Sequence, residues 1–437
     1  MSAAAPGFVS SPGAGIAGDI RVPGDKSISH RAAMLGAIAV GTTEIQGFLE
    51  GEDCRATLAA LEAMGVSIER VAPGRLRVHG VGLRGLTAPA RALDLGNSGT
   101  SMRLLTGILA GQAFDSELVG DASLMRRPME RVAAPLRLMG AAIRTQDGLP
   151  PLAIEGGHAL RGCEHALEIP SAQVKSALLL AGLYATGPTR VLEPGVSRDH
   201  TERMLEAFGV SVACSGTSAG IVGPATLKAT RIEVPGDFSS AAFFVVAGLI
   251  AGSAPLRIRD VGINPTRTAL IDILQLMGAD IRLHELTMQA REPRADIEVR
   301  PSRLRGIVVP PALVPIALDE LPILFAAAAV AEGDTVVTGA AELRVKESDR
   351  LAAMADGLES IGVAVDRLPE GLLVHGGPVS GGAVSSRGDH RVAMTFAVLG
   401  ARARSPIEIR DVQNVATSFP GFAEVARAVG LRLEAAA

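Results

Sequence analysis

The sequence predicts an α/β protein of two globular domains, each built from three copies of one repeated unit. An apolar segment with a polar start recurs six times, about every 70 residues. Each copy leads into a short β-type run and then into an amphipathic helix pattern that ends in a hydrophobic residue and a glycine. Two strands with a turn between them close the unit. A period of this length, with whole supersecondary units inside it, indicates a repeat architecture.

The apolar segments are predicted to form six buried helices, because they are hydrophobic nearly all round. Their starts carry residues that cap helices, and simple capping explains any single one of them equally well. If pseudo-symmetry makes the helices parallel, their N-termini point towards one interdomain cleft and attract anions there. The copies read KSISHRAAMLGAIAVG from Lys26, NSGTSMRLLTGILAG from Asn97, SAQVKSALLLAGLYATG from Ser171, DFSSAAFFVVAGLIAG from Asp237, DELPILFAAAAVAEG from Asp319 and DHRVAMTFAVLGA from Asp389.

The closing strands are predicted to pair as hairpins. In the first copy they are VSIERVA (66–72) and RLRVHGV (75–81), and in the fifth VAVDRL (363–368) and LLVHGG (372–377). The sixth copy stops after LRLEAAA, so its final strand is missing at the C-terminus. We expect the N-terminal run GIAGDIRV (15–22) to complete that unit.

This closure divides the chain into two predicted domains. One domain covers residues 22–235, and the other combines residues 1–21 with 236–437. The two crossings carry nearly the same sequence, RVPGDKS at 21–27 and EVPGDFS at 233–239. Because Pro-Gly is a turn signal suited to a hinge, we expect hinges near 21–26 and 233–238.

Composition excludes several classes of protein. The chain has 437 residues, 48% hydrophobic and only 3% aromatic, and its net charge is about −4, so we expect no nucleic-acid surface. The longest apolar runs are shorter than the roughly 18–20 residues that span a bilayer, so no membrane segment is expected. Three cysteines without CxxC spacing predict reduced thiols and no zinc site. The first residues lack the pattern of a signal peptide, and we therefore expect a cytoplasmic protein.

Basic residues cluster near the helix starts. A charge run is usually a solvated face, but these charges sit in otherwise apolar sequence in several copies. Arginine pairs phosphate and carboxylate bidentately, so the pattern indicates a small ligand that carries both groups. The cluster comprises Lys26, Arg31, Arg103, Arg126, Arg127, Arg198, Arg391 and, in the segment RVKESDR, Arg344, Lys346 and Arg350.

Acid–base candidates stand among these charges. Asp319 and Glu320 open a buried helix, where a carboxylate is a capping residue by default. Glu347 lies beside Lys346, and a structural ion pair is its alternative explanation. A carboxylate held between apolar surface and cations can be tuned for proton transfer. Three histidines, His30, His200 and His390, lack metal-ligand spacing, so we expect at most hydrogen-bonding roles and no metal.

Seven motifs in register closely resemble the 5-enolpyruvylshikimate-3-phosphate synthase family. They are PGDKSISHR, LGNSGTSMR, GDASLMRRPM, PSAQVKSALLLAGL, ALDELPI, RVKESDRL and GDHRVAM, and together they cover nearly the whole chain. The resemblance implies two domains of three βαβαββ units with pseudo-threefold symmetry, an inside-out α/β barrel. It implies transfer of the enolpyruvyl group of phosphoenolpyruvate to the 5-hydroxyl of shikimate 3-phosphate, in chorismate and aromatic amino-acid biosynthesis. It also implies no metal or organic cofactor and a monomer.

The resemblance also assigns site residues. It implies that Lys26 is catalytic and shared by both substrates, that Asp319 takes the proton from the attacking hydroxyl, and that Glu347 protonates and then deprotonates the methylene carbon. Shikimate 3-phosphate would be bound by Lys26, Ser27, Arg31, Ser171, Ala172, Gln173, Ser197, Arg198, Asp319 and Lys346. Phosphoenolpyruvate would be bound by Lys26, Asn97, Gly99, Arg127, Gln173, Arg350 and Arg391.

Some positions depart from the family pattern. Ala172 stands where many members carry a second serine, Glu342 where many carry asparagine, and Thr417 where many carry a lysine before Phe-Pro. Leu104 replaces a proline that is common elsewhere. Gly99 is retained, which predicts room for the inhibitor glyphosate.

Two other functions fit parts of the pattern. The related enolpyruvyl transferase that acts on UDP-N-acetylglucosamine shares the fold and the donor, but it typically uses a loop cysteine, and DASLMRRPM (121–129) contains none. A non-catalytic repeat binding module explains the period. It does not explain why Asp319, Glu347 and the arginines gather at helix starts.

Overall fold

The computed structural model describes residues 7–13 and 15–436. The predicted domain segment 1–21 and the expectation of no signal peptide therefore rest partly on residues 1–6 and 14, which lie outside the described residues. The chain is a mixed α/β protein, as predicted, in which helices and strands alternate along the sequence.

Two compact units divide the chain. The inserted unit is Gly24–Val234 together with Met288–Glu292. The terminal unit comprises the chain up to Pro23, Pro235–Thr287, and everything from Pro293 on. The assignment of Met288–Glu292 to the inserted unit could not be predicted, because no local pattern marks that segment.

The inserted unit contains six α-helices and three sheets. The helices are α1 (Lys26–Ile38), α2 (Glu52–Ala63), α3 (Gly99–Leu109), α4 (Glu130–Leu138), α5 (Ala172–Gly182) and α6 (His200–Ala207), with a short 3-10 helix η1 (Leu124–Arg126). The strands are β3 (Val40–Gln46), β4 (Ser67–Ala72), β5 (Arg75–Val81), β6 (Leu93–Asp94), β7 (Ser116–Val119), β8 (Ala142–Gln146), β9 (Leu149–Glu155), β10 (Glu164–Ala166), β11 (Gly187–Leu192), β12 (Ala213–Ser215), β13 (Ser218–Gly223) and β14 (Arg231–Glu233).

The three sheets of the inserted unit share one strand order. The orders are β14-β3-β5-β4, β6-β7-β9-β8 and β10-β11-β13-β12. In each sheet the first two strands are parallel and the remaining pairs are antiparallel. The predicted hairpin of the first copy is confirmed, since β4 and β5 pair antiparallel with Ser67 opposite His79.

The described residues of the terminal unit form seven α-helices and three sheets, one of which has three strands. Its helices are α7 (Phe238–Ala251), α8 (Ala269–Leu276), α9 (Leu321–Ala329), α10 (Arg350–Ser360), α11 (His390–Leu399), α12 (Val415–Ser418) and α13 (Phe422–Ala428), with 3-10 helices η2 (Leu318–Glu320), η3 (Ala341–Val345) and η4 (Gly400–Arg402). Its strands are β1 (Gly7–Ser11), β2 (Ile16–Arg21), β15 (Gly252–Gly262), β16 (Asp280–Gln289), β17 (Glu292–Arg300), β18 (Asp334–Val337), β19 (Val365–Leu368), β20 (Gly371–His375), β21 (Gly382–Ser385), β22 (Ile407–Arg410) and β23 (Arg432–Ala436).

The strand expected to complete the sixth copy is the wrong one. The run at 15–22 forms β2, which pairs parallel with β15 in the sheet β16-β17-β15-β2. The sixth copy is completed by the preceding strand β1, which lies between β22 and β23 in the sheet β21-β22-β1-β23. A Pro12-Gly13 step ends β1, and Gly13 has a φ of 87°, so two short strands form where the sequence analysis used only one. The predicted hairpin of the fifth copy is confirmed in the sheet β18-β20-β19.

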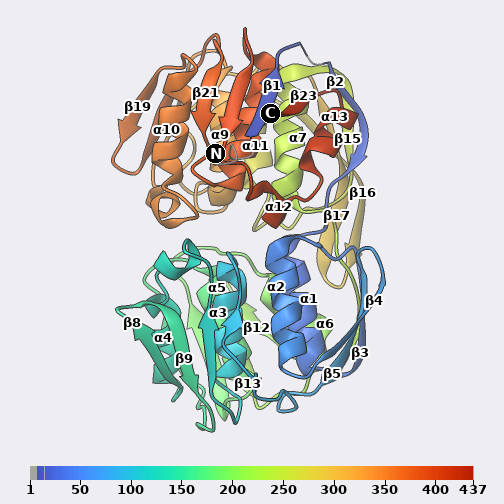
Figure 1. Cartoon of the computed structure of the whole chain (residues 1–437), viewed down its shortest axis with the longest axis vertical. Helices are drawn as coiled ribbons and strands as arrows, with labels where there is room; N and C mark the ends of the chain where they lie inside the picture. Colours follow the sequence, from blue (N-terminus) through green and yellow to red (C-terminus); the bar gives the residue numbers. More distant parts are fainter. Residues whose placement is uncertain (1–6, 14, 437) are drawn as a thin grey trace, which may run out of the picture. The chain divides into compact units, whose positions relative to one another are not determined.

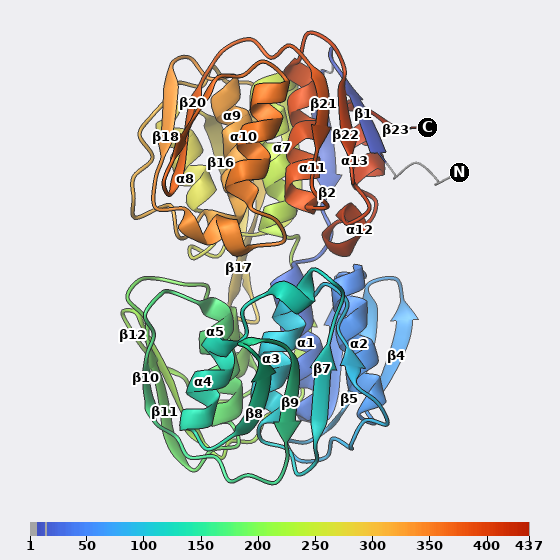
Figure 2. The ribbon, with the colours of Figure 1, turned by 60° about the vertical axis from the view of Figure 1, so that its left-hand side comes forward.

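Apolar helices form the core of each unit, with the sheets outside them (Figures 1 and 2). All residues of α7 and α9 are buried, as the all-round hydrophobic pattern predicted. With few aromatic residues, the helices pack closely through glycine. A Cβ at Gly107 of α3 would lie only 2.2 Å from the carbonyl oxygen of Ala177 in α5. A composition poor in aromatic residues thus gives a core of closely packed helices. This packing holds the starts of the helices at fixed positions.

Across the described ranges, no helix is both long enough and apolar enough to cross a membrane.

Candidate functional site

Most of the apolar helices begin with a side-chain cap. Asp25, Ser98 and Ser171 accept hydrogen bonds from backbone N–H groups in the first turns of α1, α3 and α5. Asp237 and Asp389 do the same for α7 and α11. The predicted capping residues are confirmed at these helices. Each capped start fixes the polar residues of the following turn, where the sequence places most candidate site residues.

Lys26 begins α1 and is held by an acidic partner on the next helix. Its Nζ lies 2.7 Å from Oδ2 of Asp53, which is buried at the start of α2. A buried carboxylate is stable only when it is paired, so this contact fixes both side chains. The ammonium of Lys26 is therefore positioned before any ligand arrives.

Arg31 lies one turn further along α1 and joins three helices. Its Nε donates to Oγ1 of Thr201 at 2.6 Å, and its Nη2 donates to Oγ of Ser176 at 2.8 Å. Its Nη1 donates to the carbonyl oxygen of Ser27 at 3.0 Å. Burial lowers the pKa of Arg31 to about 10, and the positive charge of Arg198 contributes in the same direction. Ser27 is therefore hydrogen-bonded to Arg31, and Arg198 is near enough for its charge to act on Arg31.

A second group surrounds the start of α3. Arg127 Nη2 donates to Oδ1 of Asn97 at 2.7 Å, and Asn97 Nδ2 donates to Oδ2 of Asp121 at 2.7 Å. A Cβ at Gly99 would lie 3.0 Å from Nη1 of Arg127 and 3.1 Å from Nη1 of Arg103. The missing side chain at Gly99 thus leaves space for two guanidinium groups at a helix N-terminus, which favours an anion.

Gln173 connects α5 to this group. Its Oε1 accepts from Nη1 of Arg103 at 2.6 Å, and its Nε2 donates to Oγ1 of Thr100 at 3.0 Å. Arg103 stands among the basic residues near helix starts, but the substrate-binding residues predicted from the sequence do not include it. Its hydrogen bond to Gln173 spans 70 residues of sequence, so no local motif could have shown it.

Ser171 and Ser197 meet at a buried carboxylate that the sequence analysis did not select. Glu193 Oε1 accepts from the backbone N–H of Ser171 at 2.8 Å, and Glu193 Oε2 accepts from Oγ of Ser197 at 2.7 Å. Ala172 is the first residue of α5, and its carbonyl oxygen accepts from Oγ of Ser176 at 2.6 Å.

In the terminal unit, Arg350 binds three carboxylates. Its Nε lies 2.8 Å from Oδ2 of Asp389, its Nη2 lies 2.5 Å from Oε2 of Glu347, and its Nη1 lies 3.4 Å from Oδ1 of Asp319. Arg350 is only 1% exposed. Burial alone would lower its pKa, but the three negative charges outweigh burial and raise it. Both proposed proton-transfer residues, Asp319 and Glu347, therefore contact one permanently charged guanidinium.

Lys346 approaches the same carboxylates. Its Nζ lies 3.8 Å from Oδ1 of Asp319. Burial, followed by the effect of the Arg350 charge, lowers the pKa of Lys346, although Asp319 opposes this shift. Asp319, Lys346, Glu347 and Arg350 are thus brought together, as a charged group that would suit anionic ligands and proton transfer.

Arg391 enters the group from α11. Its Nη1 donates to the carbonyl oxygen of Asp319 at 2.7 Å, and its Nη2 donates to Oγ of Ser239 at 3.1 Å. Glu320 accepts from Nη1 of Arg391 at 3.3 Å and also from Oγ of Ser239. The default capping role expected for Glu320 is wrong, because it stands at the N-cap of α9 without a side-chain capping bond. Its carboxylate instead holds Arg391.

Two of the three histidines, His30 and His200, form side-chain hydrogen bonds. His30 Nδ1 lies 2.8 Å from Oγ1 of Thr57, and burial with the charges of Lys26 and Arg31 holds the pKa of His30 well below its usual value. His200 Nδ1 lies 2.7 Å from Oε1 of Glu292. The residues that the structure describes contain no cluster of three or more His, Cys, Asp or Glu side chains able to hold a metal ion.

Thr417 does not replace the missing lysine through a charge. It lies in α12, is buried, and its Oγ1 donates to the carbonyl oxygen of Asn414 at 2.7 Å. Leu104 is also fully buried, within α3, so it packs in the core.

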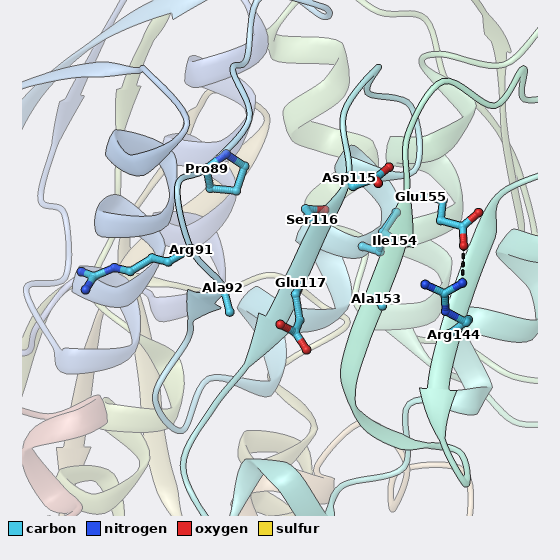
Figure 3. Close-up of a pocket in the computed structure, with 10 residues that line it drawn as sticks. All are labelled: Pro89, Arg91, Ala92, Asp115, Ser116, Glu117, Arg144, Ala153, Ile154 and Glu155. Atoms are coloured by element: carbon cyan, nitrogen blue, oxygen red, sulfur yellow. Dashed lines mark hydrogen bonds and ion pairs between the residues drawn. The ribbon is translucent and has the colours of Figure 1, made fainter.

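A hollow on the sheet β6-β7-β9-β8 contains none of the predicted site residues (Figure 3). Its polar lining includes the carboxylates of Asp115, Glu117 and Glu155, and Glu155 forms an ion pair with Arg144. Excess negative charge there disfavours a ligand with phosphate and carboxylate groups. The helix starts therefore remain the candidate site.

Comparisons with known proteins identify the family of the chain. Residues 11–426 match the family described as EPSP synthase (3-phosphoshikimate 1-carboxyvinyltransferase). The chain is 58% identical to the 3-phosphoshikimate 1-carboxyvinyltransferase of Methylococcus capsulatus over 428 residues, covering 98% of both chains. It is 56% identical to the protein of that name from Nitrosococcus oceani, covering 98% of this chain and 96% of the relative. The solved structure of EPSP synthase from Acinetobacter baumannii superposes with a TM-score of 0.90 at 52% identity, covering 99% of this chain and 100% of that one.

Proposed function

Because the chain belongs to the EPSP synthase family, we infer that it transfers the enolpyruvyl group of phosphoenolpyruvate to the 5-hydroxyl of shikimate 3-phosphate and releases phosphate. The observation that carries this function is a family match that extends over nearly the whole chain and includes every predicted site motif. The reaction belongs to chorismate and aromatic amino-acid biosynthesis. It requires a site for two anions, and the positively charged helix starts suit both of them.

The finer architecture is part of the proposal. The predicted domains are residues 22–235 and residues 1–21 plus 236–437, with hinges near 21–26 and 233–238. Each domain would hold three βαβαββ units related by pseudo-threefold symmetry, as in an inside-out α/β barrel. The strand order common to the sheets of the inserted unit supports this arrangement.

Shikimate 3-phosphate would be held mainly by residues of the inserted unit. Arg31, Ser27 and Arg198 share one neighbourhood, and Ser171 and Ser197 share one carboxylate partner, which supports a common ligand. The full proposed set is Lys26, Ser27, Arg31, Ser171, Ala172, Gln173, Ser197 and Arg198, with Asp319 and Lys346 from the terminal unit.

Phosphoenolpyruvate would bind guanidinium groups from both units. The hydrogen bond between Asn97 and Arg127, and the space beside Gly99, support an anion site at the start of α3. Charge-assisted bonds to arginine are the strongest hydrogen bonds available to a phosphate. The full proposed set is Lys26, Asn97, Gly99, Arg127, Gln173, Arg350 and Arg391.

The proposed chemistry is addition followed by elimination. Glu347 protonates the methylene carbon of phosphoenolpyruvate, and C2 becomes electrophilic. Asp319 takes the proton from the 5-hydroxyl as it attacks C2, giving a tetrahedral intermediate. Loss of phosphate, and return of a methyl proton to Glu347, gives the product. Lys26 and the arginines stabilise the developing negative charge, and no metal or organic cofactor takes part.

Contacts of Arg350 support these roles. The guanidinium already pairs with Glu347 and Asp319, and an incoming anion would compete for it. A carboxyl group beside a bound anion holds its proton more readily, which would prepare Glu347 to act as an acid.

Further parts of the proposal concern inhibition, assembly and location. Glyphosate is an expected inhibitor, because Gly99 leaves room beside Arg127 and Arg103. We expect a cytoplasmic monomer that binds neither nucleic acid nor membrane.

An acceptor comparison tests the function. Phosphate release from phosphoenolpyruvate is measured with the full chain and either shikimate 3-phosphate or UDP-N-acetylglucosamine. Release with only the first acceptor supports the proposal. Release with only the second would support the cell-wall enzyme instead, and release with neither would leave the non-catalytic binding module as the better explanation.

A further inference from the structure

A buried ionic cluster lies in the inserted unit beside residues proposed to bind shikimate 3-phosphate. It consists of Lys175 on α5, Glu202 on α6 and Glu193, which follows β11. Lys175 Nζ lies 2.8 Å from Glu193 Oε2 and 2.8 Å from Glu202 Oε1. The three side chains are only 6%, 1% and 6% exposed, in the order Lys175, Glu193, Glu202. Placing charges in the interior is costly, so their arrangement calls for an explanation beyond stability.

Glu193 differs from Glu202 in what else it touches. Its two oxygens accept from the backbone N–H of Ser171 at 2.8 Å and from the hydroxyl of Ser197 at 2.7 Å. Ser171 caps α5, whereas Ser197 belongs to the loop before α6. One carboxylate therefore joins two separate segments that carry substrate-binding candidates. Glu202 contacts Lys175, and its Oε2 is buried without a hydrogen-bond partner.

A neighbouring contact joins the same two helices. Arg31 donates to both Thr201 of α6 and Ser176 of α5, and Thr201 donates to Ser176 at 2.7 Å. The starts of α5 and α6 are thus connected twice, once through Arg31 and once through Glu193.

We propose that Glu193 is a positioning residue for shikimate 3-phosphate, which fixes Ser171 and Ser197 at the spacing that this substrate needs, while Lys175 offsets part of its negative charge. The inference rests on the proposed function. A carboxylate without a cationic partner would repel a bound dianion. The ion pair with Lys175 weakens this repulsion and is therefore part of the proposal. Burial alone would lower the pKa of Lys175, but the two glutamates outweigh burial and raise it, so the ammonium stays charged.

The test compares two matched variants, Glu193→Gln and Glu202→Gln. Each removes one carboxylate from Lys175, but only the first disturbs the two serines. We expect Glu193→Gln to raise KM for shikimate 3-phosphate by about tenfold, while kcat and KM for phosphoenolpyruvate change less than about threefold. Glu202→Gln should leave KM for shikimate 3-phosphate within about twofold, whether or not its melting temperature falls.

A variant with a shorter acidic side chain distinguishes a loss of positioning from a loss of folding stability. Glu193→Asp keeps the charge next to Lys175 but loses the reach to both serines, so it should raise KM for shikimate 3-phosphate at a melting temperature near that of the wild type. Unchanged KM in both Glu193 variants, or an equal rise in Glu202→Gln, would overturn the inference. A wild-type chain that releases no phosphate with shikimate 3-phosphate would instead refute the proposed function.

Discussion

At the scale of single residues, Arg350 holds the acidic group of the terminal unit together. One of its partners, Asp389, is fully buried, and Glu347 and Asp319 complete the group. Removing one partner of a buried pair leaves an uncompensated charge. We therefore expect Arg350→Met to lower the free energy of unfolding by about 3–5 kcal/mol in urea titrations, and to abolish turnover.

A surface arginine provides the control for that measurement. Arg367 pairs with Asp356 and Glu359 while 46% of its side chain is exposed. Arg367→Met should cost less than about 1 kcal/mol, because exposed pairs are screened by solvent. Equal losses in both variants would show that the buried group has no special role.

Gly99 makes a prediction about inhibition. A methyl group there would meet guanidinium nitrogens of Arg127 and Arg103 at 3.0 and 3.1 Å, so either the arginines or the ligand must shift. One methyl group in a tight site changes binding about tenfold or more. We expect Gly99→Ala to raise the glyphosate concentration for half-inhibition by at least about tenfold in a phosphate-release assay. An identical inhibition curve for both proteins would contradict the proposed space at this position.

His30 makes a prediction about pH. Its pKa is held well below 6.5 in the folded chain by burial, with Lys26 and Arg31 contributing, so the unfolded chain binds the proton more readily. Stability is therefore lost as pH falls below the unfolded value, by at most about 1.4 kcal/mol per pH unit. In urea titrations between about pH 5 and 6.5, His30→Gln should show a shallower loss than the wild type.

His375 affects the pH dependence of stability in the opposite direction. Hydrogen bonds that His375 donates to Asp334 and Asp366 raise its pKa, so its contribution is present at low pH and is lost as pH rises through the folded value. His375→Gln should therefore steepen the loss of stability towards low pH. A wild-type slope in His30→Gln would mean that other groups cause the acid sensitivity.

At the scale of elements, close contact between α3 and α5 depends on Gly107. A Cβ there would lie 2.2 Å from the carbonyl oxygen of Ala177, which is backbone and cannot rotate away. We expect Gly107→Ala to destabilise the chain by about 1–3 kcal/mol, although alanine is the better helix former. Gly377→Ala, with no atom within 4 Å of the added Cβ, should change stability by less than about 0.5 kcal/mol. Calorimetry of both variants checks the pair, and a neutral Gly107→Ala would show that the helices can separate without cost.

Elements with a local signal could be predicted, and those fixed by distant contacts could not. Capped apolar helices and the hairpins of the first and fifth copies follow from residue patterns, so they appear where the sequence predicted them. That β1 completes the sixth copy, while β2 joins the sheet of β15, depends on pairing with strands more than 200 residues away. The segment Met288–Glu292 is held in the inserted unit by contacts such as Glu292 with His200, which no local pattern reveals.

The candidate site likewise contains residues that could be predicted from local motifs and residues whose roles could not. Motifs marked the residues that would touch substrate, because those residues sit at helix starts in recognisable runs. The motifs contain Arg103 and Glu320 without showing that these side chains orient Gln173 and Arg391. They do not contain Glu193, which orients the two serines. The partners of Arg103 and Glu320 lie 70 and 71 residues away in the sequence, so a local motif does not reveal these supporting roles.

At the scale of the whole molecule, the residues proposed for the reaction are divided between the two units. Lys26 and Arg127 belong to the inserted unit, whereas Asp319, Glu347 and Arg350 belong to the terminal unit. Neither group alone supplies both the anion-binding residues and the proposed proton-transfer residues. Activity should therefore require the full chain and both substrates.

Phosphorus NMR of the full chain with phosphoenolpyruvate and shikimate 3-phosphate tests this claim most directly. Both substrate signals should decline together, while inorganic phosphate and one new phosphomonoester signal grow in equal amounts, and Glu347→Gln should sharply slow all four changes. Phosphoenolpyruvate that stays intact in the presence of folded protein, or phosphate that appears without shikimate 3-phosphate, would contradict the account.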